Sequence, residues 1–342
     1  VTVAWGVNNS NAWRMGFDEI NAKGGIHGRK IKYIVEDNQY QVPRSIQAAN
    51  KLINRDNVFF MVANGGTPMN NACFKDQLAA NIPSLFPITA ARSMYEPFKF
   101  YAAASYVDQV RAGINYLVKE KGKKNVCVMY QDTDFGKEIL EGAKEQTEKL
   151  KIKIVETATH KPTDQDFTAS LTKLKAANCD LIVMGTIVRD TIIPYTAARK
   201  SGWTDVTFLG SSATYDAAVA AAPGMDGFYG MGLTDMLYAD SELPAVRKFY
   251  ADYKAKFGKD PNVGAIYGYV GADLTVQGLK NAGKDLTVDS FVKGMEAIKD
   301  SKDLFGGPPA TFGPNIRQGA NGSFVAEVKN GKWVRLTPAL GF

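Results

Sequence analysis

Residues 125–156 read NVCVMYQDTDFGKEILEGAKEQTEKLKIKIVE, and this stretch decides the fold class. Asn125–Tyr130 is a short apolar run of the kind that forms a buried strand. Ile139 and Ala143 then have the four-residue spacing of one helix face, and Lys151–Glu156 returns to a strand pattern. A strand, a helix and a strand in this order predict a parallel β-sheet covered by helices, which is the α/β class.

The same alternation extends to both sides of this stretch. Further strands are expected at Val1–Trp5, Lys30–Val35, Val58–Val62, Pro83–Phe86, Asp180–Met184, Thr207–Gly210 and Phe228–Leu233. Helical spacing between them predicts helices, one with Trp13 and Phe17 on its buried face and another near Asn70–Ala80. Strand starts in the first half recur 121 to 124 residues later, as Lys30 does at Lys151, so we expect two βα units of similar size.

The last third of the chain follows a different pattern. Helices are expected in succession at Pro244–Phe257, Gly264–Asn281 and Val288–Ile298. Phe324–Val328 and Trp333–Leu336 then form the two strands of a hairpin. Asn330-Gly331 is the expected turn, because this pair favours the two-residue hairpin loop with positive φ.

The composition is that of an ordinary globular protein. A length of 342 residues suggests two domains, and 45% hydrophobic with 22% charged residues excludes disorder, collagen and coiled coil as the main architecture. No apolar run approaches the roughly 20 residues that span a bilayer, so no membrane insertion is expected. The 41 basic and 35 acidic residues are scattered, so nucleic acid is not an expected partner.

Cysteine and histidine are too sparse for a metal centre or a common catalytic site. Cys127 and Cys179 lie in apolar runs and are interpreted as small core residues, with one disulfide left open. His27 and His160 lie in different halves, without neighbours at metal-ligand spacing. Phosphate-loop, dinucleotide and G-x-S-x-G motifs are missing, which disfavours a nucleotide-dependent oxidoreductase. We expect no enzyme, no catalytic residue, no metal and no cofactor, although an enzyme with carboxylates alone stays open.

Small and hydroxyl residues follow the expected strands, where α/β sheets bind ligands. Asn64–Pro68 and Pro87–Ala91 end two strands of the first unit, and Gly185–Arg189 and Ser211–Thr214 lie at the matching places of the second. Glycines allow close backbone approach, hydroxyls donate or accept hydrogen bonds, and helix N-termini attract anions. Four such loops at equivalent positions favour a binding protein, although each loop alone is also typical of a tight turn.

Six motifs in this order resemble type I periplasmic solute-binding proteins of ABC importers, of the leucine/isoleucine/valine-binding branch. They are GFDEINAKGGIHGRKI (Gly16–Ile31), EDNQYQVPRSIQAANKLI (Glu36–Ile53), NGGTPMNNA (Asn64–Ala72), NIPSLFPITAA (Asn81–Ala91), YQDTDFGKEILEG (Tyr130–Gly142) and YGYVGADLTVQGL (Tyr267–Leu279). The resemblance covers nearly the whole chain. It is strongest to the members that bind aromatic or other carboxylic acids.

This resemblance implies two Rossmann-like doubly wound lobes, joined by a three-strand hinge, with a ligand cleft between them. The N-terminal lobe would hold residues 1–106 and 237–317, and the C-terminal lobe residues 107–236 and 318–342. Carried over position by position, the implied ligand-binding residues are Gly66, Thr67, Ile88, Thr89, Ala90, Tyr106, Phe135, Thr186, Val188, Ser212 and Tyr267. Thr67 would hold the ligand carboxylate. Arg189 is a further candidate for a charge-assisted bond, and Trp13 one for stacking.

Two departures from the family pattern affect the expected ligand and its contacts. Amino-acid-binding members usually carry an acid near Ser212, but SSAT (Ser211–Thr214) offers hydroxyls alone. Because a buried ammonium without a counter-charge is costly, an aromatic or hydrophobic carboxylate is favoured over an amino acid. The Gly6–Asn11 segment is also shorter than the family's usual first loop, which leaves contacts from that loop open.

The function that the resemblance implies is that of a receptor which encloses a small organic acid by hinge closure and delivers it to a membrane permease. We expect a periplasmic monomer whose signal peptide is removed. Branched-chain amino acid binding and a ligand-sensing regulatory domain of the same fold are the alternatives.

Overall fold

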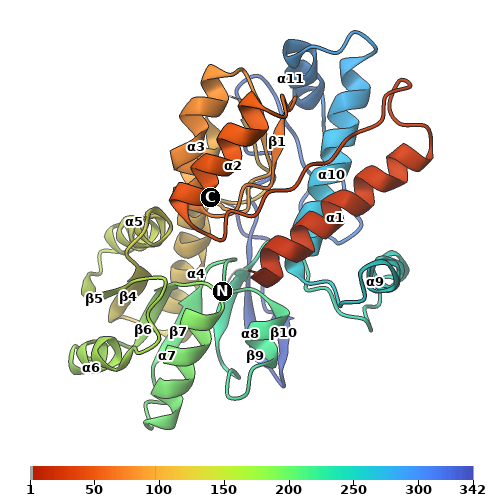
Figure 1. Ribbon diagram of the computed structural model, residues 1–342. Coiled ribbons are helices and arrows are strands. Elements are labelled where there is room, and N and C mark those ends of the chain that lie inside the picture. Colours follow the sequence, from red (N-terminus) through yellow and green to blue (C-terminus); the bar gives the residue numbers. More distant parts are fainter. Residues whose placement is uncertain (1–2, 97, 342) are drawn as a thin grey trace. The chain divides into compact units, whose positions relative to one another are not determined.

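The computed structural model describes residues 3–96 and 98–341, which form two compact units (Figure 1). The N-terminal unit holds the described residues up to 103 together with residues 237–320. The C-terminal unit holds residues 104–236 and 321–341. The units therefore divide after residues 103, 236 and 320, whereas the resemblance places the lobe boundaries after residues 106, 236 and 317.

The C-terminal unit is built on a seven-stranded sheet with the order β10-β9-β8-β7-β6-β4-β5. The strands are β4 (Val126–Gln131), β5 (Ile154–His160), β6 (Leu181–Gly185), β7 (Thr207–Gly210), β8 (Tyr229–Gly232), β9 (Phe324–Lys329) and β10 (Lys332–Arg335). Strands β4 to β8 pair in parallel, and β9 joins β8 in antiparallel fashion. The helices are α4 (Tyr106–Lys121), α5 (Asp134–Lys149), α6 (Thr168–Ala176), α7 (Arg189–Lys200) and α8 (Ala217–Ala221).

The parallel strands inside the sheet, β4, β6, β7 and β8, are buried along nearly their whole length, whereas the edge strand β5 is mostly exposed or partly buried. Every residue of β6 is buried, as expected for a parallel strand covered by helices. The hairpin of β9 and β10 turns at Asn330 (φ 52°) and Gly331 (φ 73°), as the Asn-Gly pair predicts. The predicted α/β class is confirmed.

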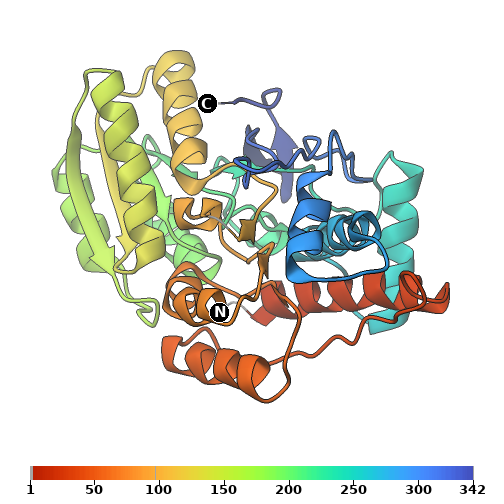
Figure 2. The ribbon, with the colours of Figure 1, turned by 90° about the horizontal axis from the view of Figure 1, so that it is seen from above.

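The N-terminal unit has a smaller parallel sheet with the order β1-β2-β3. Its elements are α1 (Val3–Ala22), α2 (Val42–Asn54), β1 (Met61–Val62), α3 (Thr67–Ala79), β2 (Ser84–Leu85), the 3₁₀ turn η1 (Arg92–Tyr95), β3 (Lys99–Phe100), α9 (Pro244–Phe257), α10 (Val263–Ala282) and α11 (Val288–Glu296). Helices α1 and α10 lie side by side in both views (Figures 1 and 2). Their close approach needs Gly268, since a Cβ there would lie 2.3 Å from the Asn9 carbonyl oxygen.

Two strand predictions in this unit are wrong. In Val1–Trp5, residues 3 to 5 begin α1, while residues 1 and 2 lie outside the described part. The short Gly6–Asn11 segment is accordingly helix and not a loop. Residues 30–35 form no strand: the Asn21 side chain exchanges two hydrogen bonds of 2.8 Å with the backbone of Ile31, where a strand would need a paired neighbour.

Cys127 in β4 and Cys179 just before β6 form a disulfide with a Cα–Cα distance of 5.8 Å. Both are buried, as the interpretation as small core residues predicts, and the disulfide that the sequence left open joins them. They meet because β4 and β6 are parallel neighbours, which brings together residues that are 52 positions apart in the sequence. Cys73 is the remaining cysteine and is free.

Removing this disulfide should lower the free energy of unfolding by about 3 to 4 kcal/mol, because a cross-link over this separation restricts the unfolded chain. Urea unfolding of the Cys127→Ala/Cys179→Ala double variant against the wild type measures the loss. Cys73→Ala is the control, since it truncates a buried cysteine that forms no disulfide. A wild-type unfolding midpoint that dithiothreitol leaves unchanged would contradict the prediction.

Candidate functional site

Two strand-end loops of the N-terminal unit lie side by side. Gly65 and Ile88 form a parallel bridge, in which the Gly66 N–H donates to the Ile88 oxygen at 3.1 Å. The Ile88 N–H in turn donates to the Asn64 oxygen at 3.0 Å. The loops after β1 and β2 are thus held together through their backbones, and the next residue of each is a buried threonine, Thr67 and Thr89.

The hydroxyls of Thr67 and Thr89 lie 2.6 Å apart. Because each hydroxyl has one hydrogen, the pair uses one hydrogen between its members and keeps the other to donate. The Thr89 oxygen also accepts from the Ala91 N–H at 3.2 Å, and Ala90 between them is buried. Thr67 is the first residue of α3, whose N-cap, Gly66, offers no side-chain cap. The arrangement suits a ligand oxygen that accepts a hydrogen bond at a helix N-terminus.

The Asn70 side chain fixes the loop after β1, a role that was not predicted. Its side-chain NH₂ donates to the Asn64 and Gly66 carbonyl oxygens, both at 2.8 Å. The GTP-x-N spacing was the sequence signal, because it puts Asn70 one helical turn after Gly66. The nearby Cys73 thiol hydrogen-bonds with Ser45, and burial raises the pKa of this thiol, which keeps it protonated at neutral pH.

The other candidate aromatics of this unit lie on α10 and α1. The Tyr267 ring faces Trp5 with 5.7 Å between centroids. Trp13 is fully buried and packs against Phe17 and Phe86, with centroid distances of 5.4 and 6.1 Å. Trp13 therefore belongs to the core of this unit and does not present a stacking surface.

In the C-terminal unit, the candidate residues follow the carboxyl ends of neighbouring strands. Phe135 lies in the first turn of α5, after β4, and its ring meets Tyr106 of α4 edge-on at 4.9 Å between centroids. Ser212 follows β7, and its N–H donates to the Gln109 side-chain oxygen at 2.8 Å. Gln109 was not predicted. It is fully buried and also donates to the Ala104 oxygen, so it fixes the Ser212 loop onto the start of α4.

Thr186 and Val188 follow β6, which lies beside β7 in the sheet. The Thr191 hydroxyl donates to the Ile187 oxygen, so the bond of 2.6 Å between Thr186 and Thr191 takes its hydrogen from Thr186. Thr186 is fully buried, and its hydroxyl hydrogen is already used. Val188 is the N-cap residue of α7 and is partly buried.

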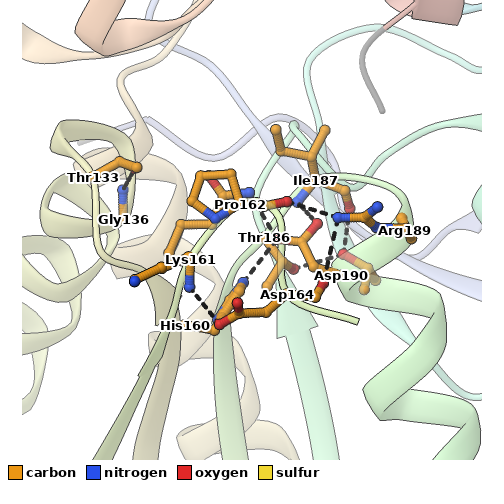
Figure 3. A network of polar contacts seen from close by, with 12 residues as sticks. Thr133, Gly136, His160, Lys161, Pro162, Asp164, Thr186, Ile187, Arg189 and Asp190 are labelled. Atoms are coloured by element: carbon orange, nitrogen blue, oxygen red, sulfur yellow. Dashed lines mark hydrogen bonds and ion pairs between the residues drawn. The ribbon is translucent and has the colours of Figure 1, made fainter. Parts of the chain in front are cut away.

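Arg189 is held by the neighbouring loop. Its Nη2 donates to the Pro162 oxygen at 2.7 Å and to the Asp164 oxygen at 3.3 Å (Figure 3). The guanidinium therefore joins the loop after β5 to the first turn of α7. Arg189 was a candidate for a charge-assisted bond to the ligand, and its Nη2 is used instead by two backbone carbonyl oxygens of the same chain.

A buried polar cluster beside Arg189 was missed altogether. The Asp190 carboxylate meets Nε2 of His160 at 2.9 Å (Figure 3). It also accepts from the Gln131 side chain at 2.7 Å. Its other oxygen accepts from the Ile187 N–H at 2.9 Å. The only sequence signal was that His160 follows the predicted strand Lys151–Glu156, which in the structure extends to His160 as β5. Its partner lies 30 residues further along the chain.

In the described residues, no three His, Cys, Asp or Glu side chains are grouped so that they could hold a metal ion. None of the helices in residues 3–96 and 98–341 combines the length and apolarity that a membrane crossing requires.

Two α/β units, each with small and hydroxyl residues at the carboxyl ends of parallel strands, define a ligand-binding protein. Residues 2–332 match the periplasmic binding protein family, and the chain belongs to that family. The resemblance to type I periplasmic solute-binding proteins is confirmed. The family is one of extracytoplasmic solute-binding receptors, whose members bind small molecules and work with ABC transporter permeases.

Individual relatives are distant in sequence. The Leu/Ile/Val-binding protein homolog 8 of Brucella abortus is 23% identical over 97% of this chain and 86% of its own. A fatty acid ABC transporter substrate-binding protein from Thermomonospora curvata has a TM-score of 0.90 and 22% identity, over 100% of this chain and 89% of its own. An R. palustris solute-binding protein in complex with benzoate has a TM-score of 0.84 and 18% identity, over 100% and 94%.

Gly66→Ala should lower the free energy of unfolding by about 2 kcal/mol, since Gly66 has a φ of 94° and its Cβ would lie 2.7 Å from the Tyr40 ring. Gly65→Ala is the matched control next to it. A Cβ on Gly65 meets nothing within 4 Å, so this change should cost less than about 0.5 kcal/mol. Chemical denaturation of the two variants checks the difference, and equal losses would refute it.

Proposed function

We propose that this protein is the solute-binding receptor of an ABC importer and that it binds a small organic carboxylic acid. The observation that carries the proposal is the hydroxyl pair of Thr67 and Thr89 at the start of α3. The pair keeps one hydroxyl hydrogen, which a carboxylate would accept, and the α3 N-terminus adds a favourable dipole. The benzoate and fatty acid named for the two similar structures are carboxylates as well.

The proposal favours an aromatic or aliphatic acid over an amino acid. An amino acid brings an ammonium group, which needs an acidic partner when it is buried. Two buried carboxylates lie near the C-terminal candidate loops, and each already accepts hydrogen bonds from its own chain. Asp190 is bonded by Gln131, His160 and Ile187, and Asp216 accepts from the Ala218 N–H at the start of α8.

Branched-chain amino acid binding is the alternative function. The Brucella relative, which is named for leucine, isoleucine and valine, favours it. On either function, loops of both units would contact the ligand, and the units would close on it by hinge motion.

We further propose that the protein is a receptor and not an enzyme. The two histidines and the cysteine outside the disulfide all hydrogen-bond within the fold. His27 bonds with the Lys280 oxygen, His160 with Asp190 and Cys73 with Ser45. The disulfide of Cys127 and Cys179 supports an extracytoplasmic location, since such bonds persist in oxidising compartments. The proposal includes a monomer that binds no nucleic acid.

A thermal-shift screen with benzoate, octanoate and valine tests the ligand class. Benzoate or octanoate at 100 times its dissociation constant should stabilise the protein by about 2.7 kcal/mol, and valine should do little. Small-angle scattering with the stabilising acid should show a smaller radius of gyration. Strong stabilisation by valine alone would favour the amino acid alternative.

Thr67→Val should weaken binding of the acid found in that screen about tenfold, because it removes the hydroxyl at the first residue of α3 and leaves the Thr89 hydroxyl without the partner that orients it. Thr147→Val is the control: its hydroxyl is equally buried but donates to the Ala143 oxygen within α5. Calorimetry of both variants measures the affinities. Equal affinity of Thr67→Val and the wild type would remove this loop from the binding site.

A further inference from the structure

We propose that Asp190, held by His160 and Gln131, is a positioning residue that fixes the loop Thr186–Val188 and thereby raises ligand affinity. The proposal deepens the proposed function and rests on it, because this loop is one of the predicted contacts in the C-terminal unit.

Three donors, the Gln131 side chain, Nε2 of His160 and the Ile187 N–H, converge on the buried Asp190 carboxylate. Gln131 ends β4, His160 ends β5, and Asp190 lies in the first turn of α7, as Figure 3 shows for His160 and Asp190. The Asp190 and His160 side chains are only 2% and 3% exposed. Since an ionised carboxylate only accepts, Nε2 of His160 must carry the hydrogen of their bond. Each donor is needed, because a buried charge that lacks hydrogen bonds is costly.

The carboxylate holds the loop through its backbone. One Asp190 oxygen accepts from the Ile187 N–H at 2.9 Å, while the Thr191 hydroxyl donates to the carbonyl oxygen of the same residue. Both backbone polar groups of Ile187 are therefore bound by side chains of α7. Thr186 is fixed in addition by its hydroxyl bond to Thr191. The loop can move only if these bonds open.

Arg189 couples the loop to a second segment. It reaches the Pro162 and Asp164 carbonyl oxygens, and the Asp164 carboxylate in turn accepts from the Lys161 N–H at 2.8 Å (Figure 3). His160 and Arg189 thus connect the segment after β5 to the segment after β6 at two points. We infer that the two segments form one rigid support for the residues that face a ligand.

Such a support acts on affinity without touching the ligand. A loop that is already fixed loses little conformational entropy on binding, so more of the contact energy appears as affinity. In metal sites, partners that orient the ligating residues change affinity by about tenfold or more when they are removed, and we expect a similar effect here. Removing a hydrogen bond to Asp190 should therefore lower ligand affinity, although the residues that contact the ligand are unchanged.

Gln131→Leu and Gln146→Leu form a matched pair that tests this. Both glutamines are buried, and each donates to a single side chain, Gln131 to Asp190 and Gln146 to Asn115 between α5 and α4. Hydrogen exchange of the Ile187 amide in ligand-free protein should become about tenfold faster in Gln131→Leu and should not change in Gln146→Leu. Affinity for benzoate or octanoate should fall about tenfold in Gln131→Leu and stay within about twofold in Gln146→Leu.

His160→Gln and His160→Leu provide a second pair if Gln131→Leu does not fold. Glutamine can still donate to Asp190 and should keep the wild-type exchange rate and affinity, whereas leucine should reproduce the loss. Unchanged Ile187 exchange in Gln131→Leu and His160→Leu would overturn the proposal. Faster exchange with unchanged affinity would overturn it as well.

Failure of the proposed function is distinct. In that case benzoate, octanoate and valine would all fail to bind the wild type, while the exchange measurement, which needs no ligand, still decides whether Asp190 fixes the loop.

Discussion

The pairing register of β4 with its two parallel neighbours is the constraint on which the polar part of the C-terminal unit depends. It places Gln131 opposite His160 on one side and Tyr130 opposite Gly185 on the other. A Cβ on Gly185 would lie 2.6 Å from the Tyr130 Cβ, so the fit on the β6 side requires glycine. A slip of β4 by one residue would turn Gln131 to the opposite face and deprive the buried Asp190 carboxylate of this donor.

Both units fix their strand-end loops with a buried polar side chain that lies outside the loop. Asn70 binds two carbonyl oxygens of the loop after β1, Asp190 binds the Ile187 N–H after β6, and Gln109 binds the Ser212 N–H after β7. In each case the polar side chain comes from a helix that packs against the sheet, so the loop and the core share one set of interactions. Loops held in this way present backbone and hydroxyl groups in a fixed geometry.

Local signals made much of the fold predictable. Thr207–Gly210 and Pro244–Phe257 have the predicted bounds, because apolar runs and helical spacing depend only on nearby residues. The strand prediction for Val1–Trp5 was wrong because a short apolar run is compatible with either a strand or a helix. Which of the two forms depends on the packing of α1 against α10. The candidate loops could be found because they follow strands. The side chains that fix these loops could not be found, because they meet only in the folded sheet, as His160 and Asp190 do across 30 residues of sequence.

The chemistry of the loops explains why their rigidity should matter so much. Thr67 and Thr89 offer a hydroxyl hydrogen, while the Asp190 carboxylate and Nη2 of Arg189, near the other loops, bond to their own chain. A neutral hydrogen bond contributes only about 1 kcal/mol net, less than a bond to a charged group. If the loops of such a receptor became ordered only on binding, the entropy lost would offset much of the free energy of these hydrogen bonds. On the function proposed above, tight binding of a small acid would depend in part on residues that do not contact it.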